Sequence, residues 1–254
     1  VEQSRQVASV MADKSRKAMD LAMELLQGYD EAKAEQVAQM ETDVDRFEDE
    51  LGTYLVKLSS RQLSGKDSET LNTILHCIGD FERISDHARN VKEAAQEMYD
   101  KKLDFSDKAQ EELKVFERAV HDILDITMNS FIKGDLNLAR QVEPMEEVID
   151  GLSLDVKQRH VRRLRKGKCT IELGFILSDV ITNFERVSDH CSNIAVCLVQ
   201  VNEDEFDTHA YLDELRQEDN KDFQSKVLAC REKYQLPPKK QERLAEKNAK
   251  LLAE

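Results

Sequence analysis

The sequence predicts an all-α protein, built as a tandem repeat of two three-helix bundles with a C-terminal helical tail. Three observations predict this fold: few helix-breaking residues, apolar residues at helical spacing, and a motif that occurs twice. The 254 residues include 8 Gly, 3 Pro and no Trp, and 35% of them are charged. Such a composition favours long helices over sheets, while the hydrophobic 40% is enough for a continuous core.

The duplicated motif is the strongest of these observations. Residues 80–90 read DFERISDHARN and residues 183–193 read NFERVSDHCSN, so seven residues match at the same offsets. Each copy lies in an apolar heptad pattern, which places one apolar stripe along one face of a helix. The stripes comprise Ile74, Cys77, Phe81, Ile84, Ala88, Val91, Ala95 and Met98, and then Leu173, Leu177, Val180, Phe184, Val187, Cys191, Ile194, Leu198 and Val201.

A second apolar stripe also repeats and predicts another helix in each half. It comprises Val37, Met40, Val44, Phe47 and Leu51 in the first half, and Val142, Met145, Ile149, Leu152 and Val156 in the second. Because long helices joined by short loops pack as antiparallel neighbours, the two striped helices of each half are expected to lie side by side.

Three helices are expected in each half. They run near 3–28, 30–62 and 68–101, and then near 107–133, 135–165 and 169–201. Ser106-Asp107 and Asp135 have the side chains of helix N-caps.

The predicted domains are a first bundle at 1–104, a second bundle at 105–201 and an acidic, helical tail at 202–254. In the tail we expect a helix near 208–234, a break at Pro237-Pro238 and a short polar helix after it.

Packing explains the repeated apolar residues but not the repeated acidic ones. In each half, both striped helices carry Glu and Asp four residues apart, which places the two carboxylates on one face. The sets are Glu41, Asp45, Glu82 and Asp86, and Glu146, Asp150, Glu185 and Asp189. A bound cation would relieve the repulsion within each set, and oxygen-rich clusters suit Mg, Ca, Mn or Fe, with Zn as a further candidate.

Two other kinds of residue in the motif bear on these sites. His87 and His190 flank the stripe and could add a nitrogen ligand or a supporting hydrogen bond. Arg83 and Arg186 have two readings: each either pairs with a nearby carboxylate and replaces a metal, or orients a ligating carboxylate. The occurrence of the acidic pairs in both halves favours metal binding over a solvated acidic face.

The motif [DN]FER[IV]SDHxxN, with an ExxxD helix before each copy, resembles the PhoU family of phosphate-transport regulators over about residues 3–201. The resemblance implies that the two carboxylate sets hold metal clusters at the bundle surface, with iron or zinc favoured. Ser85 and Ser188 stand where such proteins commonly have Gly, and Asp80 has Asn183 as its counterpart. We therefore expect the two sites to differ in affinity or in the metal held.

The carboxylate sets predict a metal-binding module and not an enzyme, and the resemblance implies that it regulates phosphate transport or phosphate signalling through protein–protein contact. The resemblance further suggests the C-terminal PhoU-like portion of a bacterial sodium/phosphate cotransporter-like protein. The expected partner is the membrane domain of a phosphate transporter or a phosphate-signalling protein, and homodimer formation stays open. The net charge of −14 argues against nucleic acid as a partner.

The expected location is cytoplasmic, with the inner face of the cell membrane as the alternative. No stretch approaches the roughly 20 apolar residues of a membrane span. Membrane association is therefore expected only through a partner or through a segment that precedes Val1. The five cysteines include no CxxC pair, which favours reduced thiols.

Two other functions compete with regulation. A di-metal carboxylate enzyme would use Glu-x-x-His pairs that project into the bundle core, whereas these ExxxD pairs lie off the apolar stripe. A purely structural helical interaction domain would bind no metal at all. The basic run 159–168 either complements the dipole of its helix or meets anionic lipid or an acidic partner.

Overall fold

The structure is a computed structural model that describes residues 1–201, 212–213, 215–217 and 220–238. All regular structure within these residues is helical. The helices are α1 (Glu2–Gln27), α2 (Glu31–Ser59), α3 (Gly65–Lys101), α4 (Asp107–Lys133), α5 (Leu136–Ala139), α6 (Val142–Arg165), α7 (Ile171–Gln200) and α9 (Lys221–Lys233).

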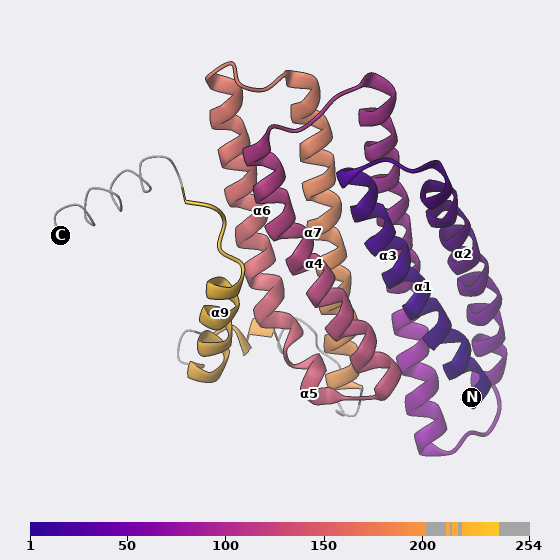
Figure 1. Cartoon of the computed structure of the whole chain (residues 1–254). Helices are drawn as coiled ribbons and strands as arrows, with labels where there is room; N and C mark the ends of the chain where they lie inside the picture. The colour runs from indigo at the N-terminus through magenta and orange to yellow at the C-terminus, as the bar shows by residue number, and fades with distance from the viewer. Residues whose placement is uncertain (202–211, 214, 218–219, 239–254) are drawn as a thin grey trace.

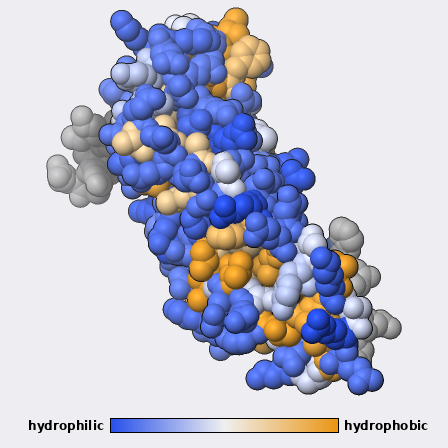
Figure 2. Space-filling view, turned by 90° about the vertical axis from the view of Figure 1, so that its right-hand side faces the viewer, coloured by the Kyte–Doolittle hydropathy of each residue, from blue (hydrophilic) through white to orange (hydrophobic). Residues whose placement is uncertain are grey.

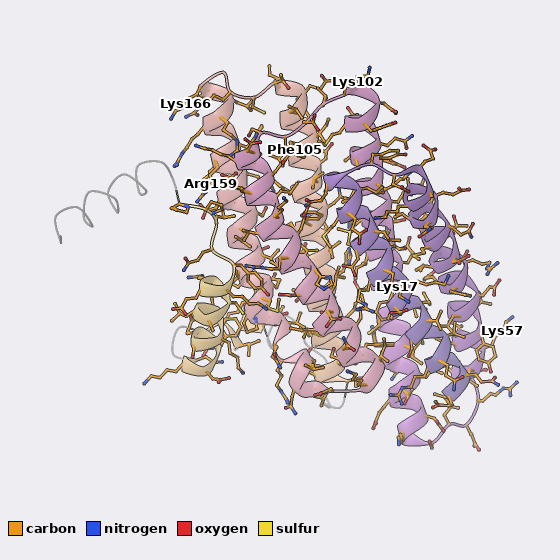
Figure 3. The ribbon with its side chains drawn as sticks, in the orientation of Figure 1. Lys17, Lys57, Lys102, Phe105, Arg159 and Lys166 are labelled. Carbon is orange, nitrogen blue, oxygen red and sulfur yellow. The ribbon has the colours of Figure 1, made fainter. Side chains whose placement is uncertain are left out.

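The long helices stand side by side (Figure 1) and pack in two groups. Helices α1, α2 and α3 form the first bundle, α4, α6 and α7 form the second, and α9 lies against α6 on its outer side. This arrangement confirms the predicted tandem of three-helix bundles with a helical tail. Charged side chains, Lys17 and Lys57 among them, project from the outer surface (Figure 3).

The apolar stripe of α3 forms the core of the first bundle. All eight stripe residues from Ile74 to Met98 are buried. Helix α1 faces them with small residues and with Met11 and Met19, which are fully buried. The Ser15 hydroxyl donates a hydrogen bond to the backbone carbonyl of Phe81 (2.8 Å), so α1 is tied to α3 at the start of the repeated motif.

The second bundle is packed in the same way as the first, but one of its predicted helices, near 135–165, is divided. Phe184 of α7 is fully buried and meets Phe116 of α4 edge to face, with ring centroids 5.4 Å apart. The predicted helix is divided into α5, capped by the Asp135 side chain, and α6, which begins at Val142. Pro144 lies in the first turn of α6, where its missing N–H is tolerated.

The two motif helices, α3 and α7, lie side by side at the centre and join the halves (Figure 1). Contacts across this interface are reciprocal. The His87 Nδ1 lies 2.8 Å from the Asn183 Oδ1, and the His190 Nδ1 lies 2.8 Å from the Asp80 Oδ1. Position 80 and position 183 therefore serve the contact between the two halves.

The helix predicted near 208–234 is interrupted within the described residues, where 212–213 and 215 are helical and 217 and 220 are not. Helix α9 begins at Lys221, because the Asn220 side chain accepts a hydrogen bond from the backbone N–H of Phe223 (3.2 Å). Phe223, Val227 and Tyr234 are buried, and residues 235–238 are not helical. The acidic stretch after Val201 and the polar helix predicted after Pro238 lie outside the described residues.

The outer surface is consistent with the charged composition. The face shown in Figure 2 is largely hydrophilic, with apolar side chains gathered in separate patches. Among the described helices, none has a stretch long and apolar enough to cross a membrane. All five cysteines are free, and Cys77, Cys191 and Cys197 are buried.

Candidate metal centre

In the second half, the structure brings three of the four predicted ligands together. Glu146 and Asp150 lie one turn apart on α6, and Asp189 reaches them from α7; their carboxylate oxygens lie within 4.8 Å of one another. Within the described part of the chain, no other group of acidic, His or Cys side chains reaches three members at that spacing. We call Glu146, Asp150 and Asp189 the α6/α7 cluster.

Burial and mutual repulsion raise the pKa of two members of this cluster, Glu146 and Asp150. Burial raises the pKa of Glu146 to about 8, assisted by the negative charges of Glu143 and Asp150 and opposed by Arg216. Burial also raises the pKa of Asp150, together with the charge of Asp189. Glu146 and Asp150, which resist ionisation, form together with Asp189 an oxygen-rich site that a cation would stabilise.

A cation of the chain itself already touches the cluster. The Arg216 guanidinium, from the segment between α7 and α9, lies 2.7 Å from the Glu146 Oε2 and 2.9 Å from the Glu143 Oε2. Glu143 is 2% exposed and also accepts a hydrogen bond from the Ser192 hydroxyl. The tail thus supplies a positive charge at the edge of the α6/α7 cluster.

The fourth predicted ligand of this half, Glu185, is engaged elsewhere. Its Oε2 accepts hydrogen bonds from the Ser153 hydroxyl (2.6 Å) and from the Lys157 ammonium (2.8 Å). Burial works to raise the pKa of Glu185, but these two hydrogen bonds hold it below the usual range. Glu185 is therefore an ionised carboxylate with a partner of its own.

The four predicted ligands of the first half are less closely grouped. Glu82 and Asp86 lie one turn apart on α3. Burial, together with the charge of Asp86, raises the pKa of Glu82 to about 7. Glu41 of α2 pairs instead with Arg89, 3.0 Å away. Asp45 is exposed on α2 and adds to the negative charge around Glu48.

Two differences between the repeats explain why Glu82 and Glu185 behave differently. The counterparts of Ser153 and Lys157 at the 105-residue offset of α2 and α6 are Glu48 and Gly52. In the first half Glu48 therefore adds a negative charge near Glu82, where the second half supplies two hydrogen-bond donors to Glu185. That the two sites differ in affinity or in the metal held stays a prediction, and Asp80 and Asn183, on which it was based, contact histidines at the α3–α7 interface.

The motif arginines and histidines also have protein partners. Arg186 Nη1 lies 3.0 Å from the Asp189 Oδ2, and Arg83 Nη1 lies 3.7 Å from the Asp86 Oδ2. Each arginine thus contacts the carboxylate three residues later, as the salt-bridge reading predicts. The Nδ1 atoms of both histidines are used at the α3–α7 interface, so only their Nε2 atoms could serve a ligand.

The sequence interpretation missed Glu143, Arg216, Ser153 and Lys157. Glu143 could have been identified by comparing the repeats, because its counterpart in the first half is the apolar Ala38. A charge at a core-facing position of only one copy requires a partner. No spacing rule identifies that partner as Arg216, which lies 73 residues away along the chain.

Comparison with known proteins agrees with this architecture. The PhoU domain family matches residues 8–95 and 114–198. A PhoU homolog from Thermotoga maritima, named a phosphate-specific transport system accessory protein, is 25% identical over 174 residues, which are 68% of this chain and 74% of that protein. A protein of the same name from Methanothermobacter thermautotrophicus is 24% identical over 186 residues, 73% of this chain and 84% of its own length.

Solved structures share the fold. PhoU from Pseudomonas aeruginosa superposes with a TM-score of 0.73 at 21% identity, covering 79% of this chain and 95% of that one. The phosphate transport system regulatory protein PhoU from Streptococcus pneumoniae gives a TM-score of 0.71 at 17% identity, covering 81% and 96%. With both repeats matched by the family and the tandem bundle in common, this chain belongs to the PhoU family.

Proposed function

We propose that this chain is a regulatory accessory protein of phosphate transport, which binds metal ions at its surface carboxylates and acts by contact with a transporter or a phosphate-signalling protein. Its relatives are named accessory proteins of phosphate-specific transport systems, which supports regulation over catalysis. The observation that carries the metal-binding part is the meeting of Glu146, Asp150 and Asp189 within 4.8 Å.

The ligand atoms of the α6/α7 cluster determine which metal ions it can bind. Carboxylate oxygens from two helices suit hard cations such as Mn, Mg or Ca, and iron equally. Zinc more often takes nitrogen or sulfur ligands, and the α6/α7 cluster contains neither. A bound ion would be held by Glu146, Asp150 and Asp189, would compete with protons at Glu146 and would face Arg216.

Equilibrium dialysis followed by elemental analysis tests the metal-binding part. The wild type, loaded in turn with Mn²⁺, Fe²⁺ and Zn²⁺, is expected to retain stoichiometric metal after exchange into metal-free buffer. The Asp150→Asn/Asp189→Asn variant is expected to lose the metal of the second half and keep its helical circular dichroism, because both side chains lie at the surface.

Asp155→Asn is the matched control, since Asp155 is an exposed carboxylate on α6 outside the cluster. Its metal content is expected to equal that of the wild type. Equal metal content in the double variant and the control would contradict binding at the α6/α7 cluster. The contact part of the proposal depends on a docking surface.

A further inference from the structure

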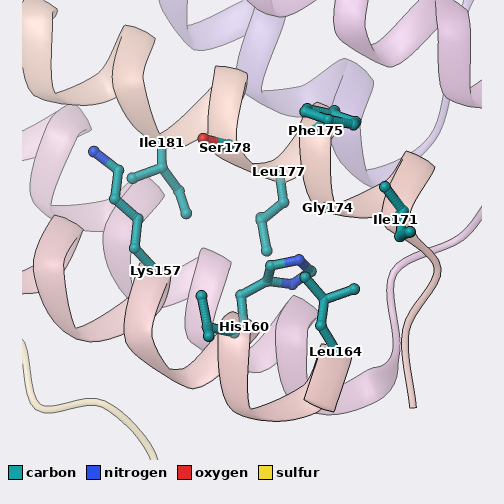
Figure 4. A pocket seen from close by; sticks show the side chains of 10 residues that line it. Lys157, His160, Leu164, Ile171, Gly174, Phe175, Leu177, Ser178 and Ile181 are labelled. Carbon is teal, nitrogen blue, oxygen red and sulfur yellow. The ribbon is translucent and has the colours of Figure 1, made fainter. Parts of the chain in front are cut away.

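One surface of the second bundle differs from the equivalent surface of the first. Between α6 and α7, near the turn that joins them, lies a groove with a volume of about 260 Å³. Its main lining residues, which define the α6/α7 groove, are His160, Leu164, Ile171, Gly174, Phe175 and Leu177. Figure 4 shows the His160 ring between Leu164 and Leu177, with Ile171 and Phe175 nearer the start of α7.

Differences between the two repeats create the hollow. At the positions of His160 and Gly174 the first bundle carries Leu55 and Leu71, and both leucines are buried. Gly174 leaves room for the imidazole, because a Cβ there would lie 2.8 Å from the His160 Nε2. His160 is 7% exposed, and its Nε2 is buried with no hydrogen-bond partner in the described part of the chain.

The rim of the groove differs between the repeats as well. Ile171 and Phe175 are 73% and 69% exposed, whereas their counterparts in the first bundle are Ser68 and Asn72. Two large apolar side chains thus stand in water beside a hollow, at positions where the other copy is polar. Contiguous exposed apolar surface of this kind marks an interaction site.

The charge around the groove indicates the sign of the charge on the partner. The chain has a net charge of −14, but basic residues gather at this groove. Lys157, which pairs with Glu185, lines it. Residues 159–168, which we call the basic end of α6, include the lining residues His160 and Leu164; Figure 3 labels Arg159 and Lys166 of this run. Two of its arginines, Arg159 and Arg163, pair with Glu112 of α4. The other four basic residues are Arg162, Arg165, Lys166 and Lys168, and they have no ion pair with any described residue.

The shape of the groove indicates the form of the partner. Small-molecule pockets usually enclose about 300–1,000 Å³, so this open hollow is too small for a typical ligand but accommodates one or two side chains. Ile171 and Phe175 protrude, as a bilayer contact requires, but Leu177 and His160 are recessed between the helices, and a flat lipid surface would leave this hollow unfilled. A groove between antiparallel helices receives the side-chain ridge of a third helix.

We infer that the α6/α7 groove docks an amphipathic helix of a partner protein, with the partner's apolar stripe on Phe175 and Ile171 and its acidic residues facing the basic end of α6. The inference rests on the contact part of the proposed function and is independent of metal binding.

Fluorescence anisotropy with two synthetic helical peptides tests this docking. Both peptides carry leucines at positions i, i+3, i+4 and i+7; one is flanked by glutamates and the other by lysines. The purified chain is expected to bind the glutamate peptide at least tenfold more tightly than the lysine peptide. Equal affinity for the two peptides, or no binding of the glutamate peptide, would overturn the inference.

Residues of the first repeat supply the variants. Ile171→Ser/Phe175→Asn removes the apolar rim, and His160→Leu/Gly174→Leu fills the hollow with the pair that the first bundle already uses. Each is expected to weaken binding of the glutamate peptide at least fivefold. The control Tyr54→Asn/Val56→Asn removes two exposed apolar side chains of α2 and is expected to leave binding unchanged; a loss equal to that of the groove variants would contradict the assignment.

Three further measurements separate the alternatives. If the rim variant lost binding to phosphatidylglycerol vesicles while peptide binding was unaffected, the surface would be a membrane contact and the inference wrong. Sedimentation that shows a wild-type dimer and a monomeric rim variant would assign the groove to a second copy of the chain, also against it. Metal content of the groove variants is expected to stay at the wild-type level, so failure of metal binding and failure of docking remain distinguishable.

Discussion

Single residues at equivalent positions of the two repeats have different surroundings, and these differences are measurable. Ser85 and Ser188 both stand at the fourth position after the motif phenylalanine and both are fully buried. The Ser85 hydroxyl donates to the carbonyl of Glu82 (2.8 Å), whereas the Ser188 hydroxyl has no hydrogen-bond partner among the described residues. A buried hydroxyl without a partner keeps its desolvation cost.

Replacement of each serine by alanine should therefore have opposite effects. Ser188→Ala is expected to raise the free energy of unfolding by up to about 1 kcal/mol, because an unpaired polar atom is removed. Ser85→Ala is expected to lower it by about 0.5–1 kcal/mol, because a hydrogen bond is lost. Urea denaturation followed by circular dichroism measures both, and a loss of stability in Ser188→Ala would point to a partner for its hydroxyl.

Glu117 of α4 makes stability depend on pH. Burial raises its pKa to about 7 from an ordinary value of 4.5, despite a hydrogen bond from Gln27. Because the folded pKa is the higher one, this group favours the folded state below pH 4.5, and that contribution is lost as the pH rises towards 7. The loss amounts to about 3 kcal/mol at most.

Glu117→Gln should remove this dependence. The variant is expected to match the wild type near pH 4.5 and to exceed its free energy of unfolding by about 2–3 kcal/mol at pH 8. Urea denaturation at several pH values measures the difference, with Glu111→Gln, an exposed position on the same helix, as the control. A difference that does not change with pH would contradict the shifted pKa.

At the scale of elements, the tail is joined to α6 by charges as well as by apolar contact. Arg216 contacts Glu143 and Glu146, and Arg231 of α9 lies 2.9 Å from the Glu147 Oε1. Only the first of these arginines touches the α6/α7 cluster. The two arginines therefore both pair with α6, but only Arg216 lies at the proposed metal site.

Arg216→Gln is expected to tighten Mn²⁺ binding at the α6/α7 cluster about tenfold, because a neighbouring positive charge no longer opposes the incoming cation. Tenfold corresponds to about 1.4 kcal/mol, a modest fraction of the interaction of two nearby charges at a protein surface. Manganese titration followed by electron paramagnetic resonance measures the affinity. Arg231→Gln should leave it unchanged, and equal affinities in the two variants would show that Arg216 does not compete with the ion.

The sequence predicted the helices that carry a periodic apolar pattern, but not the side-chain contacts between residues far apart along the chain. The stripes of α3 and α7 fixed two central helices, since Phe81 and Phe184 are buried as their spacing predicts. The ExxxD spacing identified acidic faces, but the contacts of Glu185 with Ser153 and Lys157 depend on the register of two helices. Asp135 caps α5 as its side chain predicts, but the division between α5 and α6 was missed. Pro144 lies in the first turn of α6, and its missing N–H could not bond the carbonyl of Arg140 in a continuous helix.

The whole molecule is held together by the α3–α7 interface, where the hydrogen bonds of one half are repeated by the other. Asp80 accepts from His190 and Asn193, and Asn183 accepts from Asn90 and lies against His87. Asp80 and His190 are 17% and 19% exposed, so partners left behind by a truncation would be poorly solvated. Phe81 of α3 also meets Phe131 of α4, with ring centroids 4.9 Å apart, which adds apolar contact between the halves.

Asp80→Ala/Asn183→Ala is therefore expected to lower the free energy of unfolding by about 2–4 kcal/mol, since each truncation leaves interface donors unpaired. Unfolding should remain a single transition, because the aromatic contact and the Arg16–Asp125 ion pair between α1 and α4 (2.8 Å) still join the bundles. Circular dichroism and hydrogen exchange of the outer helices α2 and α6 during urea titration test this. Asp49→Ala/Asp155→Ala, with one exposed carboxylate changed per half, is the control. Separate unfolding transitions for α2 and α6 in the wild type would mean that the two halves fold independently. Separate transitions only in the interface variant would mean that the two reciprocal contacts alone couple the unfolding of the halves.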